Sequence, residues 1–203
     1  MILSIIIPCF NEENTILEIL EKVNFQRKAF NIQIIVSDDG STDNTLTLLQ
    51  KNPHLYDILI KNKINLGKGA AIISAKSQIK GDIILIQDAD LEYDPNDYVK
   101  LLEPVLRFKA DVVMGSRLSA PPFTRVYYFW HKFGNKFITL LFNIFNNTTF
   151  TDIYSCYILF KSDLLKAEDL LTNGWEQQAE ILSPSKIKNH NQILVGEIKV
   201  RIP

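Results

Sequence analysis

The sequence predicts an α/β protein with a mostly parallel sheet and helices on both faces of that sheet. Short runs of Ile, Leu and Val alternate with segments of helical periodicity from the N-terminus to about residue 115. This alternation is typical of βαβ units, in which a helix returns the chain to the start of the next parallel strand. Polar and acidic residues follow several of the apolar runs, at the edge where open α/β sheets bind their ligands.

The first five apolar runs are expected to form strands, because each is short, aliphatic and bounded by polar or turn-forming residues. These strands are Leu3–Ile7, Ile32–Val36, Asp57–Ile60, Ile83–Ile86 and Asp111–Met114. The segments between them place apolar residues at helical spacing, as Ile16, Leu20 and Val23 show in the first segment. The expected helices are Glu12–Val23, Asp43–Lys51, Gly69–Ile79 and Pro95–Phe108.

The chain after Arg117 has a different character. Val126–Asn146 carries aromatic and aliphatic residues at helical spacing, which predicts a long amphipathic helix with a wide apolar face. We expect most of this face to pack on the sheet, while part of it docks on a membrane with Lys132 and Lys136 near the headgroups. The remaining elements are expected to be a strand at Tyr154–Phe160, a helix at Trp175–Ile187 and a strand at Ile193–Ile202.

Length and composition fit a single domain, residues 1–203. The chain is 46% hydrophobic and 22% charged, and its net charge of -1 gives no sign of a nucleic-acid partner. The two cysteines have no metal-ligand spacing, which is typical of a reducing compartment. The N-terminus lacks the basic region of a signal peptide, and no uncharged run reaches the roughly 18 residues that span a bilayer. We therefore expect a cytoplasmic protein with at most peripheral membrane contact, and a homo-oligomer stays open.

The most acidic strand end is Gln87–Glu92, directly after the apolar run Ile83–Ile86. Asp88, Asp90 and Glu92 stand at every second position, so an extended backbone would point all three carboxylates the same way. Oxygen ligands without nearby Cys or His suit a hard cation, Mg²⁺ or Mn²⁺. This predicts a metal-dependent enzyme for a phosphorylated or nucleotide-linked substrate, and the alternative is a solvated acidic turn.

The first strand ends at Pro8, before a polar segment. Asn11 is a good N-cap for the helix that follows, and acidic residues suit the first helical turn. That account would suffice for a purely structural role. The functional interpretation is that Pro8, Phe10 and Glu12 line the mouth of the sheet, where a nucleotide would bind.

The second strand is followed by two adjacent carboxylates, Asp38 and Asp39, and then by turn-forming residues. Two carboxylates exceed what a helix cap needs. A carboxylate at a strand end can accept a hydrogen bond from a base N–H or a ribose hydroxyl. We assign Asp39 to nucleotide binding and leave Asp38 open.

Two further segments could contact phosphate. Asn65–Ala71 is a helix entry made of small residues, where exposed N–H groups and Lys68 suit a phosphate. It is not a Walker A loop, and the chain has no Gly-x-Gly-x-x-Gly, so the P-loop and dinucleotide-binding interpretations are disfavoured. Gly115–Arg117 closes the fifth strand, where Arg117 could pair with a phosphate through two parallel hydrogen bonds.

In this order, the segments resemble family 2 glycosyltransferases with the GT-A fold, and among them the dolichol-phosphate and undecaprenyl-phosphate sugar synthases. The resemblance covers about residues 2–182 and implies a Rossmann-like, mostly parallel sheet with an acceptor-side extension of helix and strand. Residues 1–117 would be the nucleotide-sugar-binding half and residues 118–203 the acceptor-side half. The segments that carry it are Pro8–Glu12, Asp38–Asp43, Asn65–Ala70, Asp88–Tyr93, Gly115–Arg117, Arg125–His131 and Thr151–Asp152.

For the donor side, the resemblance implies that Asp39 and Glu12 contact the base and ribose of a UDP- or GDP-sugar. Asp88, Asp90 and Glu92 would hold the Mg²⁺ or Mn²⁺ that bridges the diphosphate. This metal and Lys68 would offset negative charge on the leaving diphosphate. The reaction would be an inverting displacement at the anomeric carbon of the sugar.

For the acceptor side, the resemblance implies that Arg117 and Arg125 receive the phosphate of a lipid-phosphate acceptor near the membrane. A phosphate monoester has a second pKa of about 6 and is already ionised at pH 7, so it needs no strong general base. A hydroxyl acceptor would need one, and Asp152 or Glu180 is then the candidate.

The chain departs from the family pattern in its acceptor half. Ile158 follows Cys156 and Tyr157 where members commonly carry Lys or Arg, and the chain stops at Pro203 where they continue into a basic segment. We therefore expect a shortened acceptor half. The alternative function is a catalytically degenerate nucleotide-sugar-binding protein that acts as a partner of a complete enzyme. A sugar-1-phosphate nucleotidyltransferase ranks last, because it would need a Gly-rich loop with Arg after the first strand.

Overall fold

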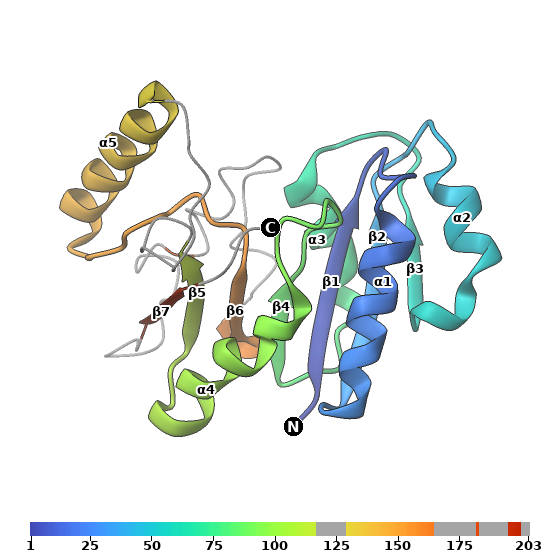
Figure 1. Cartoon of the computed structure of the whole chain (residues 1–203), viewed down its shortest axis with the longest axis horizontal. Helices are drawn as coiled ribbons and strands as arrows, with labels where there is room; N and C mark the ends of the chain where they lie inside the picture. The colour runs from blue at the N-terminus through green and yellow to red at the C-terminus, as the bar shows by residue number, and fades with distance from the viewer. Residues whose placement is uncertain (117–128, 165–181, 183–194, 200–203) are drawn as a thin grey trace.

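The structure, a computed structural model, describes residues 1–116, 129–164, 182 and 195–199 and places them around one seven-stranded sheet (Figure 1). The order across the sheet is β3-β2-β1-β4-β6-β5-β7, and only the pairings of β6 with β4 and β5 are antiparallel among the described strands. The expected mostly parallel α/β sheet is thus confirmed. The strands are β1 (Leu3–Cys9), β2 (Ile32–Asp38), β3 (Ile58–Lys61), β4 (Ile83–Ile86), β5 (Val112–Ser116), β6 (Ile158–Lys161) and β7 (Val195–Lys199).

Helices cover both faces of the sheet. Side chains of α1, α2 and α4 share one core with β1 and its neighbours, while α3 packs in a second core on the opposite face. Because both faces are covered, β1, β2 and β4 are buried along their whole length. The α-helices are α1 (Ile16–Phe25), α2 (Thr45–Lys51), α3 (Lys68–Ala75), α4 (Tyr98–Phe108) and α5 (Phe129–Asn146). Short 3₁₀ helices lie at Gln26–Lys28, Pro53–Leu55, Lys76–Gln78, Pro95–Asp97 and Ser162–Leu164.

Most elements lie within a few residues of their expected positions, and the differences concern where they begin or end; α3, for example, ends at Ala75 instead of Ile79. α1 begins at Ile16 instead of Glu12, because Asn11 adopts a φ of 57° and the next residues form a turn. β6, which was expected to begin at Tyr154, begins at Ile158. The helix expected at Trp175–Ile187 lies outside the described residues except for Leu182, which is buried.

The antiparallel direction of β6 follows from where the chain re-enters the sheet. β5 ends at the carboxyl edge, and the Gly115 N–H donates to the Tyr157 carbonyl (2.8 Å) at that same edge. A strand that starts where its neighbour finishes must run antiparallel to it. The re-entry therefore brings residues 152–157 beside the ends of β4 and β5, where α/β sheets bind ligands.

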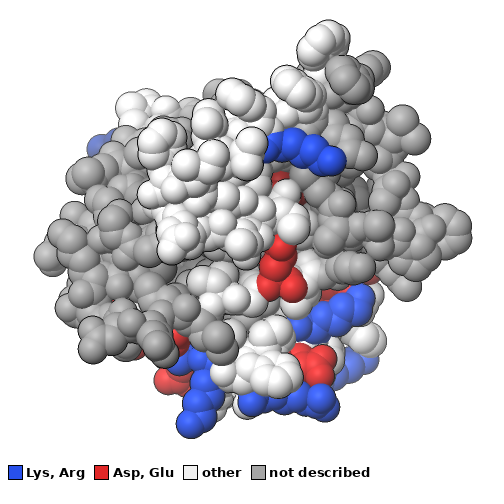
Figure 2. Space-filling model, turned by 90° about the vertical axis from the view of Figure 1, so that its left-hand side faces the viewer, with Lys and Arg blue, Asp and Glu red and all other residues white. Residues whose placement is uncertain are grey.

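Helix α5 contacts the sheet through a small part of its surface. Phe142 packs against the second core, and its ring meets that of Phe150 edge-on at 6.0 Å between centroids. Most of the apolar face is exposed, so the expectation that it packs on the sheet is wrong. Figure 1 shows α5 standing away from the sheet, and Figure 2 shows a broad area free of charged side chains on that side. The exposed residues are Trp130, Phe133, Phe137, Ile138, Leu140, Leu141, Ile144 and Phe145.

None of the helices in the described part of the chain combines the length and apolarity that crossing a membrane requires.

Candidate active site

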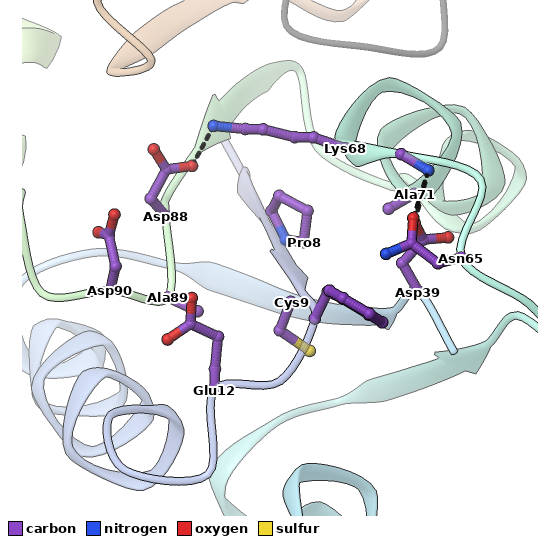
Figure 3. A pocket seen from close by; sticks show the side chains of 12 residues that line it. Pro8, Cys9, Glu12, Asp39, Asn65, Lys68, Ala71, Asp88, Ala89 and Asp90 are labelled. Atoms are coloured by element: carbon purple, nitrogen blue, oxygen red, sulfur yellow. Dashed lines mark hydrogen bonds and ion pairs between the residues drawn. The ribbon is translucent and has the colours of Figure 1, made fainter. Parts of the chain in front are cut away.

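A pocket of about 300 Å³ opens at the carboxyl edge of the sheet, where β1, β2 and β4 end (Figure 3). The ends of these parallel strands meet at one edge, which is why residues far apart in the sequence line one cavity. Residues predicted to form the site and found in its lining are Pro8, Phe10, Glu12, Asp39, Lys68, Asp88 and Asp90. Lining residues that were not predicted as site residues are Cys9, Asn65, Gly67, Ala71 and Ala89.

Asp39 is buried and holds the loop that leads into α3. Its carboxylate accepts hydrogen bonds from the Asn62 side-chain amide (2.8 Å) and from the backbone N–H groups of Leu66 (3.0 Å) and Gly67 (2.7 Å). An ionised carboxylate offers about four acceptor positions, so room remains for a ligand donor. Gly67 has a φ of 99°, a conformation that favours glycine, so the turn into α3 depends on both residues.

Asn11, expected to cap a helix, instead ties the loop after β1 to the loop after β2. Its side-chain oxygen accepts from the Thr42 N–H (2.8 Å), and its own N–H donates to Ser41 Oγ (3.0 Å). The next connection runs from the Glu13 N–H to Asp43 Oδ2 (3.1 Å). The two loops that border the pocket are therefore bound to each other by the polar residues that the sequence placed there.

The acidic loop after β4 is not extended, contrary to the prediction. β4 ends at Ile86, and Leu91 adopts a φ of 64°, which breaks the expected alternation. Asp88 and Asp90 line the pocket, whereas Glu92 does not. Across the ranges that the structure describes, no three His, Cys, Asp or Glu side chains come together as ligands of a metal ion. The three-carboxylate arrangement is therefore not what the geometry offers.

Buried polar contacts that the sequence analysis missed fix this acidic loop. Gln87 is fully buried, donates from Nε2 to the carbonyls of Asp88 and Tyr93 (both 3.2 Å), and accepts from the Tyr98 hydroxyl (3.0 Å). The Tyr93 ring stacks on Tyr157 with 4.7 Å between centroids. The available signal was a glutamine at the end of an apolar run followed six residues later by a tyrosine.

The pocket concentrates negative charge around one cation. Lys68 extends from the start of α3 across the pocket and forms an ion pair with Asp88, and the two side chains are only 12% and 11% exposed (Figure 3). Burial lowers the pKa of Lys68, but Asp88 and Cys156 outweigh burial, so the net pKa is raised. Burial raises the pKa of Asp90, and the charge of Asp88 adds to that rise. Burial and the charges of Asp90 and Asp88 raise the pKa of Glu12 as well.

Of the predicted acceptor residues, Asp152 lies in the described part of the chain. Arg117, Arg125 and Glu180 lie outside the described residues. Asp152 is fully buried, does not line the pocket, and accepts a hydrogen bond from the Asn135 side-chain amide of α5 (3.0 Å). The described contact of Asp152 anchors α5, and its role as a general base stays a prediction.

Comparison with known sequences decides the family. The model of glycosyl transferase family 2 matches residues 4–167. The chain belongs to this family. The match confirms the resemblance drawn from the motifs. The matched range includes every residue that lines the pocket of this family 2 glycosyltransferase.

Three relatives of this glycosyltransferase carry informative names. The low-salt glycan biosynthesis hexosyltransferase Agl6 of Haloferax volcanii is 29% identical over 92% of the chain and 45% of its own length. The UDP-N-acetylglucosamine–dolichyl-phosphate N-acetylglucosaminyltransferase of Methanococcus voltae is 27% identical over 97% and 84%. The dolichol-phosphate mannosyltransferase of Pyrococcus furiosus is 30% identical over 58% and 33%. The chain thus spans less than half the length of the Haloferax protein.

Solved structures share the fold of this glycosyltransferase. One is glucosyl-3-phosphoglycerate synthase of Mycobacterium tuberculosis, crystallised with Mn²⁺, UDP and phosphoglyceric acid. The match covers 99% of this chain and 70% of the synthase chain, with a TM-score of 0.74 and 18% identity. S. aureus TarS matches 96% of the chain and 58% of its own with a TM-score of 0.63 and 21% identity. These similarities confirm the expected GT-A fold.

Proposed function

We propose that this family 2 glycosyltransferase moves a sugar from a UDP- or GDP-sugar to a polyprenyl phosphate. One observation carries the proposal: in one pocket, three strand ends and the start of α3 bring together acceptors for a nucleoside, two aspartates and one lysine. The names of the Methanococcus and Pyrococcus relatives, which refer to dolichyl phosphate, support the acceptor. The M. tuberculosis structures with UDP and Mn²⁺ or Mg²⁺ support the donor and the cation.

We assign the nucleoside to the side of the pocket formed by β1 and the loop after β2. Phe10 is 40% exposed at the pocket and offers an apolar ring to a base. The remaining acceptor position of Asp39 suits the N–H of a uracil or guanine base. Glu12, which accepts from the Thr15 hydroxyl (2.6 Å), has further acceptor capacity for a ribose hydroxyl.

The residues at the other side of the pocket fit a divalent cation. Mg²⁺ is usually held by one or two carboxylates, with substrate phosphates and water as the other ligands. Asp88 and Asp90 supply this pair of carboxylates. Burial raises the pKa of Asp90, and the negative charge of Asp88 raises it further. A bound cation would offset this repulsion between the two carboxylates. A bound Mg²⁺ or Mn²⁺ would stabilise negative charge on the leaving diphosphate. Glu92 has no part in this two-carboxylate proposal.

The proposed reaction is an inverting displacement. An oxygen of the acceptor phosphate forms a bond to the anomeric carbon, the bond from that carbon to the diphosphate oxygen breaks, and its electron pair stays on the departing nucleoside diphosphate. The acceptor phosphate is ionised at pH 7 because its second pKa is about 6, so no residue has to remove a proton. Lys68, in reach of the aspartates, offsets charge on the diphosphate.

We also propose that α5 brings the enzyme to the membrane that holds the lipid acceptor. Its exposed aromatic and aliphatic side chains provide apolar area, and its sequence contains no acidic residue while Lys136 is exposed. An apolar face with cations beside it suits the interface of an anionic bilayer. Arg117 and Arg125 precede α5 in the sequence and stay the predicted contacts of the acceptor phosphate.

The test is sugar transfer by the purified chain. UDP-glucose, UDP-N-acetylglucosamine and GDP-mannose are each offered with Mn²⁺ and a polyprenyl phosphate in detergent, and lipid-linked sugar is detected by mass spectrometry. Formation of one such product that Asp90→Ala does not form supports the proposal. Folded protein that binds UDP or GDP by calorimetry but transfers no sugar to any lipid phosphate contradicts it, and favours the nucleotide-sugar-binding alternative.

A further inference from the structure

Lys68 lies where the proposed function needs a divalent cation. Its ammonium group is paired with Asp88, one of the two aspartates that line the pocket, and the pair is nearly buried. The other lining carboxylates are Glu12, Asp39 and Asp90, and Lys68 is the cationic side chain in the described lining. An ammonium group and a divalent cation on the same carboxylate repel each other, so both cannot be bound there at full strength.

The fold holds Lys68 in this position from two sides. It is the first residue of α3, and the turn that precedes it is bound by Asp39 through the Leu66 and Gly67 N–H groups. At its far end, the ammonium group also interacts with Cys156, which lies just before the antiparallel strand β6. The lysine is therefore placed by both halves of the sheet.

We propose that Lys68 is a positioning residue that occupies the cation site before metal and donor bind, and that it moves to the donor diphosphate when the metal binds Asp88. This inference rests on the metal site of the proposed function. The lysine holds the Asp88 carboxylate in place before the donor arrives. It also disfavours metal binding without nucleotide, because the displaced ammonium group then has no diphosphate to pair with.

The exchange predicts opposite effects on two ligands when the positive charge is removed. In Lys68→Gln and Lys68→Met, Mn²⁺ alone should bind roughly tenfold more tightly, within the usual range of coupling between bound ligands. UDP without metal should bind roughly tenfold more weakly, since its diphosphate loses a cation. A lysine that only supports the fold would weaken both, so the opposite signs exclude a purely structural role, and the acylation measurement below tests the movement itself.

The experiment measures free Mn²⁺ by electron paramagnetic resonance during titration of the full chain without nucleotide, and UDP affinity by calorimetry in EDTA. Lys68→Gln keeps a hydrogen-bond donor for Asp88 and so keeps that carboxylate partnered, while Lys68→Arg keeps the charge and should resemble the wild type. The matched control is Lys161→Gln, which removes the cation of the Lys161–Asp111 pair (2.6 Å) away from the pocket and should change neither affinity.

Unchanged or weaker Mn²⁺ binding in a folded Lys68→Gln or Lys68→Met variant overturns the proposal. A second measurement needs no variant: acylation of Lys68 in the wild type, followed by peptide mass spectrometry, should speed up when Mn²⁺ saturates the site and slow down when UDP is then added. An acylation rate that Mn²⁺ leaves unchanged also overturns it. Sugar transfer is measured separately, so transfer by the wild type together with unchanged Mn²⁺ affinity in Lys68→Gln rejects the exchange and leaves the proposed function standing.

Discussion

The region around the pocket, at the ends of β1, β2 and β4, and helix α5 present their side chains in opposite ways. Around the pocket, Asp39 and Gln87 are buried and hydrogen-bonded to the backbone of the loops they hold. Along α5, residues such as Phe145, which is 83% exposed, face outward. One region fixes a geometry, and the other offers apolar area.

This difference fits the two kinds of ligand we propose. A nucleotide diphosphate has defined donors and acceptors, and binding it well requires side chains locked by surrounding contacts. A bilayer surface is fluid, and binding to it scales with buried apolar area and charge. Substitutions in the two regions should therefore have different signatures: loss of geometry and affinity around the pocket, and loss of membrane partition without loss of stability on α5.

The largest effect is expected from Asp90→Ala. Removing one of the two carboxylates that would hold the cation should lower the sugar-transfer rate by roughly 10²–10³-fold, as for other groups that stabilise developing charge. The rate is measured with saturating donor and Mn²⁺. Glu92→Gln is the matched control, since Glu92 lies in the same loop but off the pocket. A larger loss in Glu92→Gln than in Asp90→Ala would restore the three-carboxylate interpretation.

The next largest effect is expected from Asp39→Ala. The substitution leaves the Leu66 and Gly67 N–H groups and the Asn62 amide without their acceptor, and a buried unpaired donor costs about 1–3 kcal/mol. We expect the free energy of unfolding to fall by about 3 kcal/mol, measured by urea denaturation, with loss of nucleotide binding. Asp39→Asn keeps one acceptor oxygen, so its free energy of unfolding should lie between those of Asp39→Ala and the wild type. Wild-type stability in Asp39→Ala would show that the pocket loops are not locked by this carboxylate.

A smaller effect, confined to the membrane, is expected from Phe145→Ser. Burying a phenylalanine side chain in an apolar environment contributes about 1.5–3 kcal/mol, so partition onto anionic vesicles should fall by about tenfold. Because the ring is exposed, stability should change by no more than about 0.5 kcal/mol. Flotation and thermal melting measure the two quantities. Phe25→Ser, at an exposed position of α1, is the control. Equal partition of all three proteins would remove α5 as the membrane contact.

The smallest effect is expected from Glu12→Gln. The pKa of Glu12 is raised from 4.5 in the folded protein, first by burial and then by Asp90 and Asp88, so the folded state binds the proton more tightly than the unfolded state. Stability therefore falls as pH rises from about 4.5 through the raised folded pKa. Because Glu12 is partly exposed, removing its charge should raise the free energy of unfolding at pH 7 by less than about 1 kcal/mol, and the gain should vanish at pH 4. A gain that persists at pH 4 would contradict this origin.

Hydrophobic patterning was enough to predict the strands and the pocket. The runs that became β1, β2 and β4 are buried on both faces, so their apolar stretches are unbroken and their ends are easy to locate. Because parallel strands end at one edge, the polar residues just after them had to meet. This is why Glu12, Asp39 and Asp88, which the sequence predicted to lie together, line one pocket.

Backbone conformation and tertiary contacts were beyond the same patterning. Asn11 and Leu91 both adopt a positive φ. The turn at Asn11 moves the start of α1, and the turn at Leu91 directs Glu92 away from the pocket. A leucine in a sequence does not indicate a positive φ. Gln87 was missed because a glutamine after an apolar run usually begins a loop, whereas here it lies buried among backbone carbonyls. The exposed face of α5 could not be told from a packed one, because amphipathicity shows which face is apolar and not what covers it.

The antiparallel entry of β6 has a consequence for how such enzymes diversify. Because β5 ends and β6 begins at the same edge of the sheet, the connection between these two strands is an excursion that starts and finishes at the edge where the pocket lies. An excursion of this kind can be lengthened, shortened or exchanged between paralogues without changing the order or direction of any strand. Selection can therefore change this connection while the strand ends and loops that line the pocket are inherited intact.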